Sequence, residues 1–259
     1  MNPYEYAQED KLTARLLKQQ LARKEKRAME LVSDFAKKHL TCLALSLGKD
    51  SMTVLHLAHK SGVLKNIELV LFSGSLVETE DTLLMIKAVE QHYSISIIQT
   101  HPTVEELASA LQLVDMTSNH PNIEFVYECL ERPRWKKMDE YGIDGTLLGL
   151  RAAESRGRKI NFRMRGFAYH NQRERVDIGQ PIADWSTQEV FAYAAAEGIP
   201  LHPIYGKFAA FGIDRFQVRQ NSIFDIKETS KRDYVLYKRM YPQAFEQAAS
   251  YLPLMRNYA

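Results

Sequence analysis

The hexapeptide Ser46-Leu47-Gly48-Lys49-Asp50-Ser51 separates a short apolar run, Thr41–Leu45, from an amphipathic segment, Asp50–Lys60. The run is typical of a buried strand and the segment of a helix, so the hexapeptide is predicted to be the turn between them. At such a turn several backbone N–H groups point at one spot, and the helix dipole adds positive potential. The sequence therefore predicts an anion site, the alternative being a surface turn with an ordinary helix cap.

The side chains of the hexapeptide suit a phosphate group. Gly48 lets the backbone approach closely, Lys49 supplies a positive charge, and Ser46 and Ser51 can donate hydroxyl hydrogen bonds. Asp50 would by itself repel an anion, and we expect it to hold a Mg²⁺ ion shared with the phosphates. The hexapeptide is not a Walker A loop, because the first glycine of that motif is missing at the required distance.

Strands and helices are predicted to alternate around the hexapeptide. Further strands are expected at Ile67–Phe72, Ile95–Gln99 and Gly145–Leu150, with a return to the sheet at Gln180–Ile182. Helices are expected at 8–39 (one or two), Glu80–His92, Val104–Leu111 and Glu124–Tyr141, the last interrupted at Pro133. This alternation predicts an α/β fold with a doubly wound, mainly parallel sheet flanked by helices, Rossmann-like in its architecture.

The second half of the chain is less regular. Val114–Pro121 is predicted to be a loop, and Arg151–Arg175, rich in arginine and poor in apolar residues, to be an active-site or lid loop. Ser186 and Glu189 form a capping box that opens a helix to about Glu197. Helices are expected at 226–239 and 242–250. We therefore divide the chain into an N-terminal helical segment (1–39), a central domain (40–205) and a mostly helical C-terminal extension (206–259).

Composition and cysteine content limit the classes of protein to which this chain can belong. The net charge is +2 and 45% of the residues are hydrophobic, as in an ordinary globular protein. Cys42 and Cys129 cannot form a zinc or iron–sulfur site by themselves. The sequence shows no signal peptide and no apolar run long enough for a membrane span, so we expect a cytoplasmic protein with reduced thiols and no membrane contact.

Positive charge gathers near both ends of the chain. Residues 11–40 carry nine Lys or Arg against three acids, and residues 206–259 carry nine against five. These segments are interpreted as solvated helix faces, or as surfaces for a protein partner or nucleic acid. Arg215 and Arg219 are interleaved with the tail aromatics, which could stack on bases or belong to the core: Phe208, Phe211, Phe216 and Phe224.

The hexapeptide together with Met52-Thr53-Val54-Leu55-His56-Leu57-Ala58 resembles the PP-loop of the adenine nucleotide α-hydrolase-like superfamily. Within it, the sequence is most similar to phosphoadenosine phosphosulfate (PAPS) reductases and to the small subunit of the heterodimeric ATP sulfurylase. Val70–Gly74 followed by Glu78-Thr79 resembles the strand and V-D-T-G-like turn of that family. Phe72 stands where the family has Asp, which puts one polar contact to the nucleotide in doubt.

Two later segments support the resemblance. Leu148–Arg156 resembles the element G-x-R-R-x-E-S-x-R, with Ala152 in place of the second arginine. Arg151 would lie at the C-terminal end of a strand and bind phosphate or sulfate, or would only pair with Glu154. Pro181–Tyr205 resembles a further motif of the family, most of which is architectural; its Asp184 is expected to brace a loop.

The resemblance implies an enzyme that holds ATP, or a sulfonucleotide (PAPS or APS), with Mg²⁺ and without an iron–sulfur cluster. The catalytic residues it implies are Lys49, Asp50, Arg151 and Glu154, with Asp50 as the metal ligand. The nucleotide-binding residues it implies are Ser46, Leu47, Gly48, Lys49, Asp50, Ser51, Phe72, Ser73, Gly74, Gly149, Arg151, Arg156 and Arg158. The central domain is then a PP-loop nucleotide-binding domain.

A PP-loop enzyme cleaves or transfers at the α-phosphate of ATP and releases pyrophosphate, here in sulfur metabolism or sulfur modification. Strict PAPS reductase chemistry is disfavoured, because the cysteine of the E-C-G-hydrophobic-H motif is absent from the last 130 residues. Cys129 near Arg132 and Arg134 could be a sulfur carrier with a lowered pKa, or a helix-packing residue. Alternatives are a sulfate adenylyltransferase-like subunit, a sulfonucleotide reductase using an external thiol, and a non-catalytic nucleotide sensor. A homo-oligomer is expected.

Overall fold

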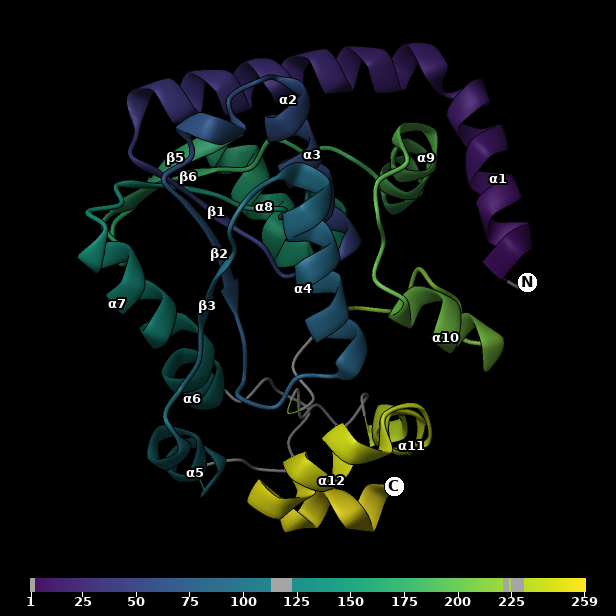
Figure 1. Ribbon diagram of the computed structural model, residues 1–259. Helices are drawn as coiled ribbons and strands as arrows, with labels where there is room; N and C mark the ends of the chain where they lie inside the picture. Colours follow the sequence, from purple (N-terminus) through teal and green to yellow (C-terminus); the bar gives the residue numbers. More distant parts are fainter. Residues whose placement is uncertain (1–2, 113–122, 221–223, 225–230) are drawn as a thin grey trace.

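The computed structural model describes residues 3–112, 123–220, 224 and 231–259. Six strands form one sheet (Figure 1): β1 (Thr41–Ala44), β2 (Leu69–Ser73), β3 (Ile98–Thr100), β4 (Gly145–Leu147), β5 (Ala168–Asn171) and β6 (Val176–Gly179). Their order is β3-β2-β1-β4-β6-β5. All neighbouring pairs are parallel except β5 with β6, which is antiparallel. The predicted doubly wound, mainly parallel sheet is confirmed.

Twelve α-helices are assigned in the described residues. The first six are α1 (Pro3–Leu16), α2 (Lys18–Lys38), α3 (Lys49–Lys60), α4 (Glu80–Tyr93), α5 (Val104–Gln112) and α6 (Ile123–Val126). The others are α7 (Arg132–Glu140), α8 (Arg156–Arg165), α9 (Thr187–Glu197), α10 (Ile204–Ala210), α11 (Lys231–Met240) and α12 (Pro242–Tyr251). Short helical turns occur at η1 (Leu64–Asn66), η2 (Tyr127–Glu131, a π-helix), η3 (Ala152–Glu154) and η5 (Pro253–Tyr258). No helix within the described ranges is long and apolar enough to span a bilayer.

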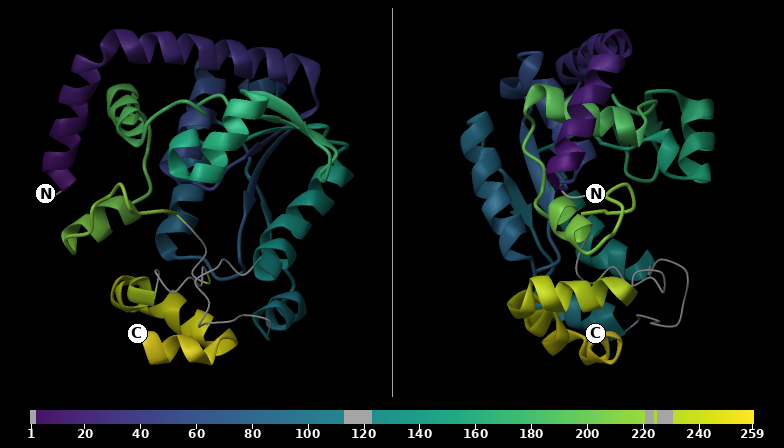
Figure 2. Two further views of the ribbon diagram at one scale, coloured as in Figure 1. Left: turned by 180° about the vertical axis from the view of Figure 1, so that it is seen from behind. Right: turned by 90° about the vertical axis from the view of Figure 1, so that its right-hand side faces the viewer.

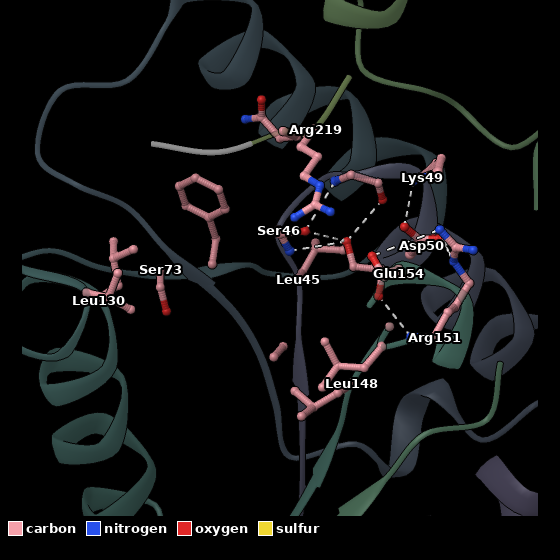
Figure 3. Close-up of a pocket in the computed structure, with 18 of the residues that line it drawn as sticks. Leu45, Ser46, Lys49, Asp50, Ser73, Leu130, Leu148, Arg151, Glu154 and Arg219 are labelled. Atoms are coloured by element: carbon pink, nitrogen blue, oxygen red, sulfur yellow. Dashed lines mark hydrogen bonds and ion pairs between the residues drawn. The ribbon is translucent and has the colours of Figure 1, made fainter. Parts of the chain in front are cut away.

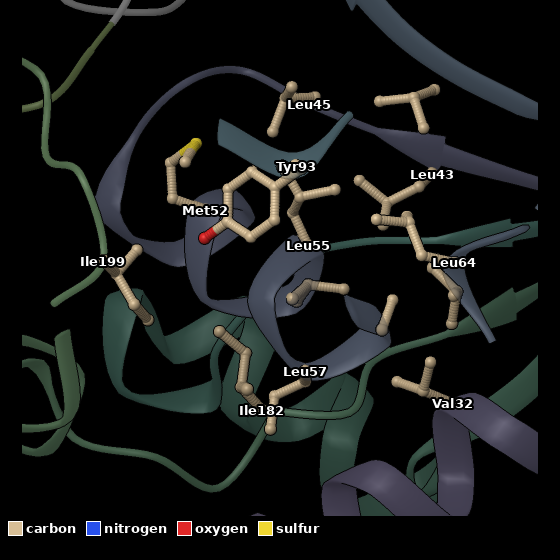
Figure 4. Packing of buried hydrophobic residues seen from close by; sticks show 14 of the residues in the cluster. Val32, Leu43, Leu45, Met52, Leu55, Leu57, Leu64, Tyr93, Ile182 and Ile199 are labelled. Carbon is tan, nitrogen blue, oxygen red and sulfur yellow. The ribbon is translucent and has the colours of Figure 1, made fainter. Parts of the chain in front are cut away.

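The alternation of side chains along the central strands supplies two apolar faces. Leu43 of β1 and Val70 of β2 belong to the large core beneath α2, α3, α4 and α9 (Figure 4). Cys42 and Leu69, one position away, belong to a smaller core on the other face, with Met138 of α7. A buried parallel sheet needs cover on both faces, and these two cores provide it.

A third apolar cluster joins the C-terminal helices to the end of the sheet. Phe224 and the buried residues of α11 and α12 pack with α5 and with Val77, which lies just beyond the C-terminal end of β2. The lower part of Figure 1 shows α5, α11 and α12 gathered at this end. The tail therefore closes over the strand ends where the hexapeptide lies.

Ion pairs add to the apolar contacts of the N-terminal helices, since α2 already buries Leu21, Ala28, Val32, Phe35 and Ala36 in the main core. Lys24 of α2 lies 2.8 Å from Glu189 Oε1 at the start of α9, and Arg27 lies 2.5 Å from Asp184. The expected bracing role of Asp184 is thus seen. At the other end, Arg215 donates to both carboxylate oxygens of Asp10 in α1, at 2.5 and 2.6 Å.

Several boundaries differ from the sequence prediction. Strand β3 is shorter than Ile95–Gln99, strand β4 ends at Leu147, and the return to the sheet is β6 at Val176–Gly179 instead of Gln180–Ile182. The interruption expected at Pro133 is wrong: Pro133 lies in the first turn of α7, where proline is tolerated, and the irregular turn is the π-helix before it. The predicted loop Val114–Pro121 and residues 226–230 of a predicted helix lie outside the described residues.

The prediction that Arg151–Arg175 is a loop is also wrong. This segment contains η3, α8 and β5. Ser155 caps α8 by accepting a hydrogen bond from the Arg158 backbone N–H, and Gly166 ends the helix at φ +71°. Helix α8 buries none of its residues, so the apolar periodicity that would reveal a helix is absent from its sequence.

Candidate functional site

The hexapeptide lies at the point where the strand order of the sheet reverses. The chain runs from β1 outward to β2 and β3, then returns to place β4 on the other side of β1. The hexapeptide follows β1, and Arg151 follows β4. In open α/β sheets the crevice beyond the carboxyl ends of two such strands is the ligand-binding position. Topology alone therefore brings Lys49 and Arg151 to one crevice.

The backbone of the hexapeptide is fixed from inside the protein. Leu47 has φ +61°, an unfavourable left-handed conformation for leucine, and its side chain is fully buried in the main core. Ser51 Oγ donates to the Gly48 carbonyl (3.1 Å) and accepts from the Ser46 backbone N–H (3.2 Å). Packing of Leu47 offsets the backbone strain, so the turn is held in shape before any ligand binds.

Tyr205 occupies one N–H group of the turn. Its hydroxyl accepts a hydrogen bond from the Lys49 backbone N–H at 3.0 Å, and burial raises its pKa above the ordinary value. The sequence analysis placed Tyr205 in an architectural motif and missed this contact, because the two residues are 156 positions apart. The first N–H of α3 is therefore not directed at an anion in this state.

Three charges meet at the start of α3 (Figure 3). Asp50 accepts hydrogen bonds from Lys49 Nζ at 2.7 Å and from Arg151 Nε at 2.6 Å. Only 5% of Lys49 and 3% of Arg151 is exposed, so both cations need the carboxylate between them. We call these three residues the charge triad.

Three further hydrogen bonds hold Arg151 in place. Its Nη1 donates to the Trp185 carbonyl (3.4 Å) and to Thr187 Oγ1 (3.2 Å), which links it to the start of α9. Glu154 Oε2 accepts from the Arg151 backbone N–H at 2.9 Å and pairs with Arg158. Arg151 and Glu154 lie 3.9 Å apart at their charged atoms, so the main partner of the Arg151 side chain is Asp50 instead of Glu154.

A cavity of about 680 Å³ opens beside the triad, within the range of small-molecule sites. Its lining includes the polar residues Ser46, Gly48, Lys49, Asp50, Ser51, Glu78, Glu131, Arg134, Arg151, Glu154, Arg158 and Arg219. It also includes the apolar residues Leu71, Phe72, Phe125, Val126, Leu130, Leu148, Phe216, Val218 and Phe224. A lining that combines apolar and aromatic side chains with cations suits a ligand with a flat apolar part and an anionic part.

Most of the predicted site residues line this cavity. Gly149 and Ser73 also line it, but Leu47, Gly74 and Arg156 are not among its lining residues. Leu47 faces the core, and Arg156 is exposed on α8. The assigned roles of all these residues stay predictions.

Arg219 is a cavity cation that the sequence suggested only as a possible nucleic-acid contact among the tail aromatics. Figure 3 places Arg219 next to Ser46, and within the described ranges it has no carboxylate partner. Its place in the cavity could not be predicted, because the tail reaches the cavity only through tertiary packing. Of the tail aromatics, Phe208 and Phe224 are core residues, whereas Phe211 and Phe216 are 46% and 45% exposed.

Neither cysteine is placed as a nucleophile. Both are fully buried, and burial raises the pKa of each thiol to about 12. The lowered pKa considered for Cys129 is therefore wrong: Arg132 pairs with Glu128, and the carboxylates of Glu128 and Glu106 raise the Cys129 pKa further. Cys129 is a helix-packing residue.

The triad carboxylate is compatible with a Mg²⁺ ion that is shared with a phosphate ligand. Among the described residues no group of three or more His, Cys, Asp or Glu side chains is arranged to hold a metal ion. Mg²⁺ in nucleotide sites needs only one or two carboxylates, since phosphates and water supply its other ligands. Asp50 lines the cavity and can supply one such carboxylate once a cation partner moves away from it.

Residues 41–239 match the family described as the phosphoadenosine phosphosulfate reductase domain. The chain belongs to this family. The match begins at the first residue of β1 and includes both the hexapeptide and the element around Arg151. The resemblance drawn from those motifs is confirmed.

Curated relatives of the PAPS reductase family cover part of this chain. The adenosine 5′-phosphosulfate reductase of Sinorhizobium fredii (strain USDA 257) is 24% identical over 129 residues, which is 49% of this chain and 50% of that protein. An uncharacterized protein of Methanocaldococcus jannaschii is 28% identical over 220 residues, 84% of this chain and 42% of that protein. The chain thus spans about half the length of the curated relatives it matches.

Solved structures share the fold. The PAPS reductase of Candida auris, in a phosphate complex, has a TM-score of 0.55 and 13% identity, covering 78% of this chain and 96% of that chain. The FMN adenylyltransferase of Candida glabrata, in complex with FMN and the ATP analogue AMPCPP, has a TM-score of 0.51 and 13% identity, covering 79% and 71%. At such identities the likeness shows the fold alone.

Gly149 sits against the backbone of the first turn of α3, and we expect Gly149→Ala to destabilise the protein. A Cβ at this position would lie 2.7 Å from Ser51 N and from the Asp50 carbonyl carbon. Neither backbone atom can move without shifting the triad, so the free energy of unfolding should fall by about 2 kcal/mol. Urea denaturation measures the change. Gly157→Ala is the control, because its Cβ would meet only Ser155 Oγ at 4.0 Å; equal stability of both variants would contradict the account.

Glu78 lines the cavity, and burial raises its pKa from 4.5 to about 7, against the hydrogen bonds from Ser75 that lower it. A carboxyl whose pKa is raised on folding favours the folded state while it is protonated. Its contribution is complete below pH ~4.5 and is lost as the pH rises through about 7, by up to about 3 kcal/mol. Urea denaturation from pH 5 to pH 7.5 should show this loss in wild type and less of it in Glu78→Gln. Parallel pH profiles in the two proteins would exclude the assignment.

Proposed function

We propose that this protein is a PP-loop enzyme that binds ATP in the cavity beside the charge triad and transfers its adenylyl group, releasing pyrophosphate. The observation that carries the proposal is the Asp50 carboxylate held between Lys49 and Arg151. At this position two buried cations already stabilise a negatively charged group of the protein itself. Family membership and the position at the strand switch point support it.

The mixed lining of the cavity suits the two chemical parts of a nucleotide. Phe72, Phe125 and Phe224 would pack on the base and sugar. The start of α3 would hold the phosphates, because the helix dipole and Lys49 favour anions there. A Candida glabrata neighbour of the same fold is described in complex with an ATP analogue and FMN, and we carry only the nucleotide over to this proposal.

Binding would exchange the partners of the triad. Phosphate oxygens would replace Asp50 as the partner of Lys49 Nζ, which lets the carboxylate turn toward Mg²⁺. Mg²⁺, when bound, supplies further neutralisation of the phosphate charge. The two cations are fixed before the substrate arrives, so little reorganisation is needed when charge develops on the leaving group.

In the transfer step a nucleophilic oxygen of the acceptor attacks the α-phosphorus of ATP. A bond forms between that oxygen and the α-phosphorus while the bond to the bridging oxygen of the β-phosphate breaks, and pyrophosphate leaves with the electron pair. Lys49 would stabilise the leaving pyrophosphate, and Arg158 and Arg219 would line the path of the acceptor. No protein nucleophile is required, which agrees with the burial of both cysteines.

Replacement of Lys49 tests the binding step. Lys49→Ala removes the cation at the start of α3 and leaves Asp50 with Arg151 alone, so ATP affinity should fall about 100-fold or more, ~2.7 kcal/mol. Titration calorimetry with Mg-ATP measures the loss. Lys65→Ala is the matched control, because Lys65 is an exposed lysine on η1 outside the cavity. ATP affinity within twofold of wild type in Lys49→Ala would refute the proposed site.

A further inference from the structure

Helix α8 differs from every other long helix in the described parts of the chain, because it buries none of its ten residues. Its sequence, RGRKINFRMR, contains five cations and no acid. In the right-hand view of Figure 2 the segment coloured as α8 lies at the edge of the molecule. A helix with no buried residue contributes little to the core. Asn161, Phe162 and Arg165 contact Tyr169 or Phe167, and the other face of the helix is exposed.

The cations of α8 are ordered along one face. Arg156, Lys159 and Arg163 are spaced three and four residues apart, which places them in one row on a helix. All three are exposed, and within the described ranges none has a carboxylate partner. The row spans about 10 Å at ~1.5 Å per residue. Its positive charge is therefore not cancelled by the protein itself.

The first turn of α8 lies beside the cavity. Arg158, the third residue of α8, and Glu154, just before the helix, both line the cavity and pair with each other. The Glu154 carboxylate is thereby occupied by Arg158 and does not neutralise the row. At ~100° per residue the row lies on a different face of α8 from Arg158, so a polyanion with one residue in the cavity would cross the first turn of the helix to reach the row.

An apolar pair lies beside the cationic row. Ile160 and Met164 are four residues apart and are 48% and 80% exposed. Isoleucine and methionine are among the side chains that contact base faces or insert between bases in nucleic-acid complexes. A row of cations next to exposed apolar side chains fits a ligand that alternates phosphates with flat apolar groups.

We propose that α8 binds the phosphate backbone of a single-stranded nucleic acid, one unpaired nucleotide of which enters the cavity as the acceptor. The identity of the acceptor rests on the proposed adenylyl transfer, whereas the binding surface does not. Charge favours this occupant over a second copy of the chain, because two α8 helices facing each other would bring five cations against five. A free nucleotide would occupy only the cavity and leave the row unused.

The test measures binding of 15-nucleotide single-stranded RNA and DNA, labelled with fluorescein, by anisotropy at several KCl concentrations. Lys159→Ala/Arg163→Ala should weaken binding about tenfold. The slope of log affinity against log salt should fall by about 1.4, because each lost phosphate contact contributes ~0.7 for a single strand. Lys65→Ala/Lys87→Ala is the matched control, since it removes two exposed lysines that lie outside both basic terminal segments, and it should bind within twofold of wild type.

Two results would overturn the inference: neither strand binds the wild-type protein, or the α8 variant and the lysine control variant bind equally well. Loss of self-association in the α8 variant, with no strand bound by wild type, would assign the face to a second copy. Titration with Mg-ATP separates this inference from the proposed function. If Mg-ATP binds and neither strand binds, the inference about α8 is refuted and the proposed function is not. If a strand binds through α8 and Mg-ATP does not bind, the proposed adenylyl transfer is refuted and the inference about α8 is not.

Discussion

The Asp50 carboxylate, held between Lys49 and Arg151, is the interaction on which the site depends. The two cations come from opposite sides of the strand switch point, and both are almost fully buried. Burying two cations without a partner would cost several kcal/mol each, so the carboxylate is required for the fold as well as for the site. Through Arg151 the same pairing reaches Trp185 and Thr187 at the start of α9. This pairing thus adds a polar link between the end of β1, the end of β4 and α9 to the strand pairing and core packing that already join them.

The proposed function would draw on this arrangement. In the described state the positive charge of Lys49 and Arg151 is satisfied internally, while Arg219 stays exposed at the cavity. In the proposed binding step an anion would exchange with Asp50 without a change in the backbone, since Leu47 and Ser51 hold the turn. The two cations would then supply the electrostatic complement of the phosphate.

The parts that the sequence predicted well are those that depend on local pattern. The strand and helix around Gly48, the capping box at Ser186 and the alternation of strands and helices all follow from neighbouring residues, and the structure has them. The parts that it missed depend on contacts between distant segments. Tyr205 reaches Lys49 across 156 positions, and Arg219 reaches the cavity through the tail. Helix α8 was predicted to be a loop because an unburied helix carries no apolar periodicity.

In the proposed reaction the bond broken lies between the α- and β-phosphates of ATP, and phosphorus-31 NMR detects this directly. Mg-ATP is incubated with the wild-type protein and single-stranded RNA, and the phosphorus signals are followed over time. A pyrophosphate signal should grow as that of ATP falls, with the α-phosphorus appearing in an adenylyl product or AMP. Formation of ADP and inorganic phosphate would contradict the proposed reaction, because those products come from cleavage between the β- and γ-phosphates.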